Sequence, residues 1–122
     1  MVKKKRKHCT ELAKTVAKTR DKFTCLRCGA SKANGAQIQG SHIKGTGAYP
    51  NLSYYTINIK ALCASCHRWW HSAPTESGIW FKKKFPKWYR DIKDLAHAHV
   101  GKLDYNTIYK NLKEELNTFK QG

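Results

Sequence analysis

Four of the five cysteines form two Cys-x-x-Cys pairs, Cys25 with Cys28 and Cys63 with Cys66. Such pairs are typical of structural zinc sites, because each pair forms a tight turn that directs two sulfurs at one ion. A thioredoxin-like dithiol would use a single pair within a βαβ unit, and the sequence shows neither feature. We therefore expect Cys25, Cys28, Cys63 and Cys66 to hold a structural Zn²⁺.

Three histidines have positions suited to phosphodiester hydrolysis. His67 and His71 are four residues apart, so on a helix they project from one face and can share a divalent ion. His42 precedes a glycine-containing loop, and its unperturbed pKa of about 6.5 leaves the ring largely neutral at pH 7. Hydrolysis needs such a base together with a cation that offsets the charge on the phosphate. Alternatively, His67 is a further zinc ligand, both helix histidines cap the helix surface, and His42 is a surface residue at a strand end.

The chain is strongly basic, since 24 Lys and Arg residues against 8 Asp and Glu give its 122 residues a formal net charge of +16. An excess of this size favours a polyanionic partner, and nucleic acid is the leading one. No run of the sequence is long and apolar enough to anchor it in a membrane. Lys44, Lys60 and Arg68 are candidate phosphate contacts.

The first half of the chain contains the elements that must position the first cysteine pair and His42. Residues 10–22 have helical spacing and lead into Cys25. The dipeptide Asn34-Gly35 is a strong turn signal, so we expect a strand over residues 37–43. The glycine-rich residues 44–51 then form a loop.

The second half begins with a strand expected over residues 54–62, which are rich in β-branched and aromatic side chains and include Asn58. A helix starts at or just after Cys63 and continues at least to His71. Residues 75–99 should form two helices divided at Pro86.

A closing amphipathic helix is expected over residues 104–119, from Ile108, Leu112 and Leu116 with Leu103 before them. The aromatic residues from Trp69 to Tyr89 are expected mainly in the core, and stacking on unpaired bases is the alternative.

Read in order, these parts resemble a known family. The chain presents a Cys-x-x-Cys pair, Ser41-His42-Ile43 at the end of a strand, Asn58 on the next strand, and His67 and His71 on a helix after the second pair. This order resembles the HNH endonucleases over residues 25–71. The resemblance implies an α+β fold with a small zinc-stapled ββα-metal (HNH) core and flanking helices. It also implies a metal-dependent endonuclease that hydrolyses phosphodiester bonds in DNA, with RNA a less favoured substrate.

The resemblance also implies a role for each residue. His42 would be the general base, Asn58 would orient it through hydrogen bonds across the hairpin, and His67 and His71 would hold the catalytic ion. Ser41 would be a further ligand, but the family usually has aspartate or histidine at this position, and serine is a weak neutral ligand. The implied ion is Mg²⁺, while Mn²⁺, Ni²⁺ and Zn²⁺ stay open because imidazole suits softer metals.

The segment from Gly40 to Leu52 also resembles the NinG/Rap-type phage recombination nucleases, which carry a similar histidine, glycine loop and proline before the second cysteine pair. This narrower resemblance implies branched DNA as a substrate, and it is compatible with a phage recombination or packaging complex as a partner. The expected location is the cytoplasm, because no apolar stretch follows the basic residues 3–7 as it would in a signal peptide. For a phage-encoded protein this would be the cytoplasm of the host.

These expectations divide the chain into three parts: a basic N-terminal arm over residues 1–9, an HNH nuclease domain over residues 10–99, and a C-terminal amphipathic helix over residues 100–122 packed on that domain. The competing hypothesis is a non-catalytic zinc-containing module that binds nucleic acid. Such a module needs the cysteines and the positive charge, but it does not need the set formed by His42, Asn58, His67 and His71.

Overall fold

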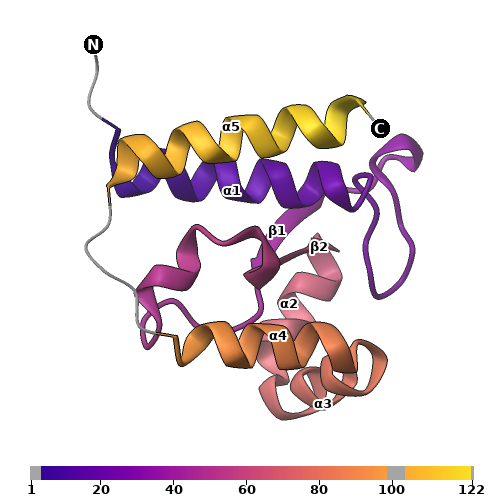
Figure 1. Ribbon diagram of the computed structural model, residues 1–122. Coiled ribbons are helices and arrows are strands. Elements are labelled where there is room, and N and C mark those ends of the chain that lie inside the picture. Colours follow the sequence, from indigo (N-terminus) through magenta and orange to yellow (C-terminus); the bar gives the residue numbers. More distant parts are fainter. Residues whose placement is uncertain (1–3, 99–103, 122) are drawn as a thin grey trace.

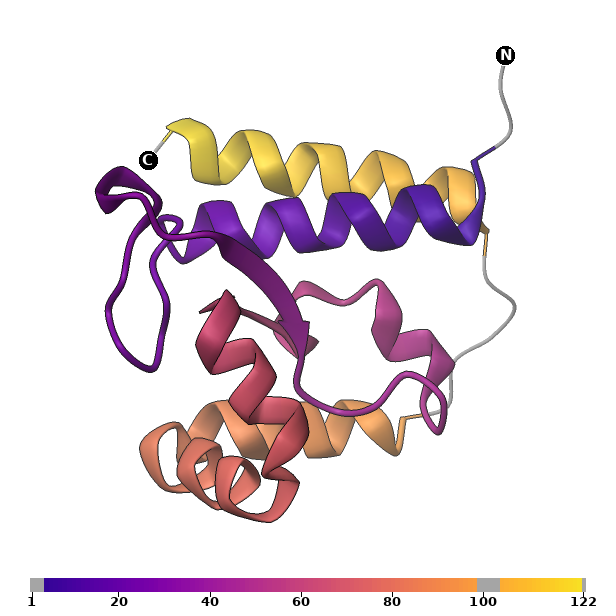
Figure 2. The same ribbon diagram turned by 180° about the vertical axis from the view of Figure 1, so that it is seen from behind.

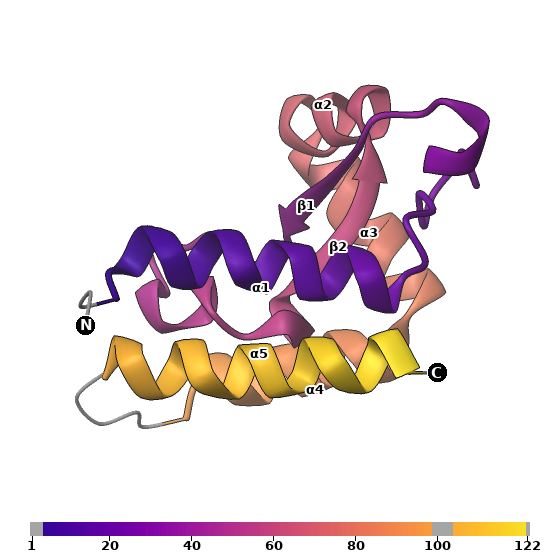
Figure 3. The same cartoon turned by 90° about the horizontal axis from the view of Figure 1, so that it is seen from above.

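Two helices from opposite ends of the sequence lie side by side and form one layer of the molecule (Figure 1). In the computed structural model, which describes residues 4–98 and 104–121, these are α1 (Arg6–Arg20) and α5 (Tyr105–Gln121). They run in the same direction, as Figure 3 shows from above. Leu112 of α5 is buried against a stripe on α1 formed by Cys9, Ala13, Val16 and Ala17. The amphipathic closing helix is therefore confirmed, while Leu103 lies outside the described residues.

The helix α1 begins at Arg6, four residues earlier than the sequence pattern indicated. Cys9 is fully buried in the apolar stripe, and its Sγ lies 3.3 Å from the carbonyl oxygen of Tyr105. Burial of Cys9 against α5 explains the longer helix, because packing adds to the helix propensity of the basic residues before it. Residues 6–9 of the expected arm are thus helical, and residues 1–3 lie outside the described part.

A two-stranded antiparallel sheet lies beneath α1. It consists of β1 (Ile38–His42) and β2 (Ile59–Cys63), paired so that Ile38 faces Cys63 and His42 faces Ile59. Side chains alternate between the two faces of a strand. Gly40 and His42 therefore share the face that packs on α1, and Gln39 and Ser41 share the face toward the helix that follows β2.

The second strand is shorter than expected, because residues 50–58 form two 3₁₀ turns, η2 (Pro50–Ser53) and η3 (Thr56–Asn58). Tyr54 is buried beside α5, where its hydroxyl donates to the hydroxyl of Tyr105 at 3.4 Å. The aromatic residues that suggested a strand thus serve the core between the turns and α5. Asn58 accordingly ends η3, immediately before β2, and is not part of the strand.

Three helices complete the fold on the opposite side of the sheet: α2 (Ala64–Ser72), α3 (Pro74–Lys84) and α4 (Pro86–Ala96). Pro86 opens α4, which confirms the expected division, since proline has no N–H to lose at the first position of a helix. The rings of α2, α3 and α4 pack mostly edge to face, and Trp88 Nε1 donates to the carbonyl of Ile57 at 2.6 Å. No helix in residues 4–98 and 104–121 combines the length and the apolar character needed to cross a bilayer.

Charged side chains at the end of α1 hold it against β2. The guanidinium of Arg20 donates to the carbonyls of Thr56 and Ile59 at 2.8 and 2.6 Å, and it pairs with Asp21 at 2.9 Å. Asp21 in turn accepts the backbone N–H of Ala61 at 3.0 Å. These bonds satisfy backbone groups at the free edge of β2, so α1 and the sheet form one unit.

The close approach of α1 to β1 predicts that Gly40→Ala destabilises the protein. A Cβ at Gly40 would lie 2.8 Å from both Cβ and Cγ of Lys14 and 3.2 Å from its Cα, so the helix must move away. We expect a loss of about 1–3 kcal/mol in the free energy of unfolding, measured by denaturant titration. Gly47→Ala is the control, because a Cβ there meets open space. Equal stability of the two variants would contradict the close packing.

Candidate metal centre and active site

The four paired cysteines come together in space. Their Sγ atoms all lie within 4.8 Å of one another, and Cys28 Sγ lies 3.6 Å from Cys63 Sγ. Four thiolates around one zinc at about 2.3 Å place their sulfurs about 3.8 Å apart. Cys25, Cys63 and Cys66 are buried and Cys28 is exposed. The residues therefore form a group that can hold a metal ion such as zinc.

The local chain folds in a way that aims the sulfurs inward. Gly29 follows the first pair with φ +81°, a left-handed conformation that favours glycine, and its N–H donates to the carbonyl of Cys25 at 3.0 Å. Cys63 ends β2 and is also the N-cap of α2, so strand and helix together fix its position. The Arg27 guanidinium donates to Cys66 Sγ at 3.5 Å and lies over the Trp69 ring at 3.7 Å. This cation offsets the negative charge that a thiolate group carries.

The α2 histidines form the pair that their spacing predicts. The Nε2 atoms of His67 and His71 are 3.1 Å apart. Two nitrogens about 2.1 Å from one ion lie about 3.0–3.4 Å apart, depending on the coordination angle. Nδ1 of His67 lies 2.7 Å from Oε1 of Gln39 on β1. An amide oxygen only accepts, so Nδ1 carries the hydrogen and Nε2 keeps its lone pair for a metal.

Ser41 does not serve this pair. It is fully buried, and its Oγ accepts a hydrogen bond from Lys60 Nζ at 3.3 Å. The expectation that Ser41 is a further ligand therefore has no support in the geometry. Within the described residues, the four cysteines are the only group of three or more His, Cys, Asp or Glu side chains placed to hold an ion.

Lys60 is buried, so it cannot make the phosphate contact expected of it. Its side chain has no exposed surface, and Nζ lies 3.3 Å from the centre of the Trp70 ring. Alternation along β2 directs Lys60 inward beside Ser41, its partner across the sheet. Burial lowers the pKa of Lys60 to about 6, although the Trp70 ring favours the charged form.

His42 ends β1, and its ring is held by the loop that follows. Nε2 of His42 lies 3.3 Å from the carbonyl oxygen of Ser53, and a carbonyl only accepts, so Nε2 carries the hydrogen. The lone pair is then on Nδ1, which is free to take a proton. Burial lowers the pKa of His42, and the positive charges of Lys14 and Lys60 add to this effect. His42 is therefore a neutral base at pH 7.

Asn58 fixes this loop from inside. Its fully buried amide accepts the Lys44 N–H at 2.8 Å and donates to the carbonyls of Lys44 and Leu52 at 3.1 and 3.3 Å. Lys44 lies two residues after His42, and Leu52 precedes Ser53, the partner of the His42 ring. One side chain thus holds both ends of the loop around His42, which is the geometry that the resemblance leads one to expect of Asn58.

The histidines approach the same strand from different sides. His42 lies on the α1 face of β1, whereas the His67 and His71 pair lies on the α2 face. Among the described residues β1 pairs with β2 alone, and Figure 2 shows β1 crossing between α1 and α2. The pKa of His67 is lowered by burial and, to smaller degrees, by the charges of His71, Lys60, Lys14 and His42. The two sets therefore lie beside the same strand, but on opposite faces of it.

The surface around the imidazole pair is hollowed and basic. A concavity of about 570 Å³ is lined by His67 and His71 together with Gln39 and Arg68. Arg68 is exposed, as a phosphate contact requires. Lys44 is half-buried, and its Nζ lies 5.6 Å from the Tyr49 ring and 6.0 Å from the Tyr89 ring. Both remain free for a phosphate, in contrast to Lys60.

Sequence reasoning missed two residues of this region. Gln39 orients His67, and alternation from Ser41 would have placed it on the helix-facing side of β1. Lys14 lowers the pKa of both His42 and His67, and its side chain lies on Gly40. Nothing in the local pattern of α1 distinguishes Lys14 from the other lysines, because its role arises only when the helix packs on β1.

The cysteine group predicts that the purified protein contains zinc. We expect about one zinc per chain, with Cys28→Ser lowering the zinc content and the unfolding temperature, since the metal contributes directly to folding. The measurements are elemental analysis and thermal unfolding. Cys9→Ala is the matched control, because Cys9 lies in the α1 stripe away from the group. Equal zinc contents in the two variants would contradict the site.

Lys60 predicts an unusual dependence of stability on pH. Its pKa is about 6 in the folded chain and 10.5 in the unfolded chain. Between these values the unfolded state binds more protons, so this residue makes stability rise with pH by about 1.4 kcal/mol per unit. Lys60→Met should therefore be more stable than wild type at pH 7, and the difference should shrink toward pH 9.

Denaturant titrations at several pH values measure this difference. Lys110→Met on α5 is the control, because Lys110 is exposed and its replacement should give a difference independent of pH. A difference for Lys60→Met that stays constant from pH 7 to 9 would mean that the buried amine keeps its proton.

No protein-family model, curated protein or solved structure matches the chain. The candidate site consists of three groups of residues. These are a four-cysteine group able to hold zinc, an imidazole pair oriented by Gln39, and a neutral His42 in a loop held by Asn58.

Proposed function

We propose that this chain is a metal-dependent endonuclease of the HNH type that hydrolyses phosphodiester bonds in DNA. The observation that carries the proposal is the imidazole pair, whose Nε2 atoms are 3.1 Å apart and whose His67 ring is oriented by Gln39 at 2.7 Å. A pair aimed at one point beside a strand that ends in a neutral histidine suits metal-assisted hydrolysis.

His67 and His71 would hold the catalytic ion, with water and phosphate oxygens as its other ligands. When bound, the ion would act as a Lewis acid that offsets negative charge on the phosphate. Imidazole donors without a carboxylate suit Mn²⁺, Ni²⁺ or Zn²⁺ better than Mg²⁺, which prefers oxygen ligands. The cysteine group would hold a separate structural zinc.

His42 would deprotonate the attacking water through Nδ1, because Nε2–H donates to Ser53. Asn58 would keep the ring in place by holding the Lys44 and Leu52 ends of the loop. Lys44 and Arg68 would contact phosphates, and so would Lys14, which lies beside both histidine sets.

The net charge of +16 supports a nucleic-acid substrate. Branched DNA and a phage recombination or packaging complex follow only from the resemblance of residues 40–52, and they extend the proposal on that basis. A cytoplasmic site of action is also part of the proposal. Rates of cleavage of linear, plasmid and branched DNA by the same protein would show which DNA shape it prefers.

One observation favours a second candidate, a zinc-containing module that binds nucleic acid without cutting it. Ser41 occupies the position of an expected ligand, yet it is buried and hydrogen-bonded to Lys60. A catalytic ion would then depend on two protein ligands. Under this hypothesis the wild-type protein binds DNA but leaves it intact with every metal.

The proposed mechanism predicts that His42→Ala lowers the rate of plasmid or branched-DNA cleavage by about 10²–10⁴-fold, assayed with Mg²⁺, Mn²⁺, Ni²⁺ and Zn²⁺. Because burial lowers the pKa of His42, the wild-type rate should stay constant through neutral pH. It should fall only when the pH drops below this lowered pKa and the ring takes up a proton. His67→Ala should raise the metal concentration needed for cleavage, since it removes one ligand.

His97→Ala is the control for these variants, because His97 is exposed at the end of α4 and has no assigned role. Zinc content and thermal unfolding verify that each variant is folded. Cleavage by His42→Ala at the wild-type rate would refute the mechanism, and absence of cleavage by wild type with all four metals would favour the binding module.

A further inference from the structure

The helices α3 and α4 form an open groove of about 710 Å³ that concentrates positive charge. Lys82 and Lys83 of α3 and Arg90 and Lys93 of α4 line it, and all four are exposed. Ile79 and Tyr89 also line it. Ile79 is a large apolar side chain that is 62% exposed. We refer to these six residues as the α3–α4 groove.

The faces of α4 separate the charges by sign. Ile92 is buried, and Trp88 bonds the Ile57 carbonyl, so these two residues anchor the core face. Asp91 pairs with Lys87 at 3.2 Å on another face and does not line the groove. On the groove face, Lys93 lies about one turn after Tyr89 and Arg90. No acidic side chain in the described residues lines the groove, so it fits a polyanion.

Tyr89 differs from the other aromatic residues of this region. The rings of Trp69, Trp70, Trp80, Phe81, Phe85 and Trp88 each contact at least one other ring of the set. The Tyr89 ring has instead the ammonium groups of Lys82 at 5.4 Å and Lys44 at 6.0 Å. Its half-buried ring thus has two cations nearby and no aromatic partner among the described contacts.

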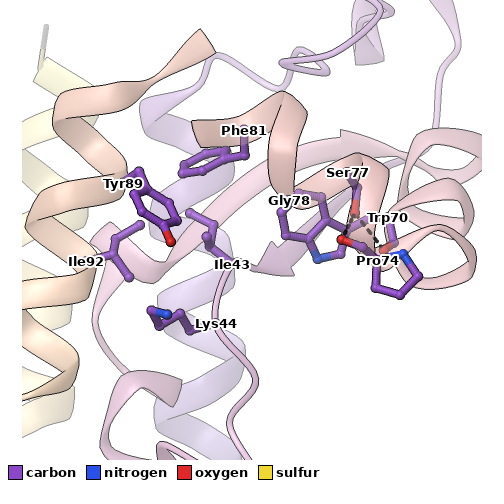
Figure 4. A pocket seen from close by; sticks show the side chains of 9 residues that line it. All are labelled: Ile43, Lys44, Trp70, Pro74, Ser77, Gly78, Phe81, Tyr89 and Ile92. Atoms are coloured by element: carbon purple, nitrogen blue, oxygen red, sulfur yellow. Dashed lines mark hydrogen bonds between the residues drawn. The ribbon is translucent and has the colours of Figure 1, made fainter. Parts of the chain in front are cut away.

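Tyr89 also lines a second, more enclosed cavity of about 190 Å³. Its walls come from α2, α3, α4 and the loop after β1, and they include Trp70, Phe81, Ile43 and Lys44 (Figure 4). The cavity therefore opens next to the loop that holds His42. Aromatic and aliphatic walls beside a lysine suit a flat apolar group attached to a phosphate, which describes a nucleobase and its backbone.

We propose that the α3–α4 groove binds the phosphates of a single-stranded DNA segment and that Tyr89 stacks on one unpaired base, which enters the cavity beside Lys44. The inference rests on the DNA partner of the proposed function and assigns the substrate class to strands with unpaired bases. A duplex keeps its bases stacked inside, so it can use the basic groove but cannot fill the cavity. Tyr89 lines both the α3–α4 groove and the cavity, so it connects the two.

The test is equilibrium binding of a short fluorescein-labelled oligothymidylate, alone and annealed to oligoadenylate. Fluorescence anisotropy is measured with protein that holds about one zinc per chain, the amount expected for the cysteine group, and with no other divalent metal, so that no strand is cut. Tyr89→Ala should weaken single-strand binding about fivefold or more, while Tyr89→Phe keeps the ring and should bind within about twofold of wild type. Duplex binding should stay unchanged in both variants.

A second pair of variants tests the groove without touching a buried side chain. Arg90→Ala combined with Lys93→Ala should reduce the slope of log affinity against log salt for the single strand by about 1.4, since two phosphate contacts are lost. Lys87→Ala on the adjacent face is the control, because it removes one charge from the same helix without altering the groove. The control should retain the wild-type slope.

Two results would overturn the proposal. In the first, Tyr89→Ala binds the single strand as tightly as wild type, or loses affinity for the single strand and the duplex equally. Either outcome would show that Tyr89 does not stack on an unpaired base. A salt slope that falls as much in Lys87→Ala as in the double variant shows general attraction and no groove. Binding and cleavage are measured separately, so failure of the nuclease proposal with these binding effects intact would leave the single-strand surface standing.

Discussion

The register of the two strands is the constraint on which the candidate site depends. Cys63 faces Ile38 across the sheet, and its sulfur lies 3.6 Å from Cys28, so the cysteine group holds the end of β2 in one position. A slip of one residue would exchange the faces of β1. Gln39 would then leave His67, and His42 would leave the Ser53 carbonyl. A metal at the cysteines would therefore organise histidines that it does not touch.

The polar residues buried beside this sheet differ in what they contribute. Asn58 makes three hydrogen bonds to backbone groups of the loop, so its burial is compensated and the loop acquires a single conformation. Lys60 has Ser41 and the Trp70 ring, which do not restore the pKa of a solvated amine. Stability alone would favour an apolar residue at that position. The fold therefore tolerates a lysine whose burial costs stability at neutral pH.

The sequence predicted those features that depend on local spacing. The cysteine pairs, the His67 and His71 pair, the division at Pro86 and the apolar stripe of α5 each follow from a repeat or a breaker. The second strand was predicted too long because Tyr54 pairs with Tyr105 of α5, which is a contact between distant segments. The sequence did not predict the roles of Gln39 and Lys14 or the burial of Lys60, for the same reason. Each of these depends on which element packs against the residue.

The charges around the imidazole pair connect metal binding with DNA binding in the proposed nuclease. Lys14 acts on His67 with the sign that disfavours a further positive charge, and Ser41 supplies no negative one. A divalent ion at His67 and His71 would therefore bind more tightly once an anion is nearby. A DNA phosphate is such an anion, and it can also ligate the ion directly. Because coupling is reciprocal, an ion would strengthen DNA binding by the factor by which DNA strengthens ion binding. Because no protein carboxylate supplies negative charge at this site, the ion would be held firmly only when DNA is bound.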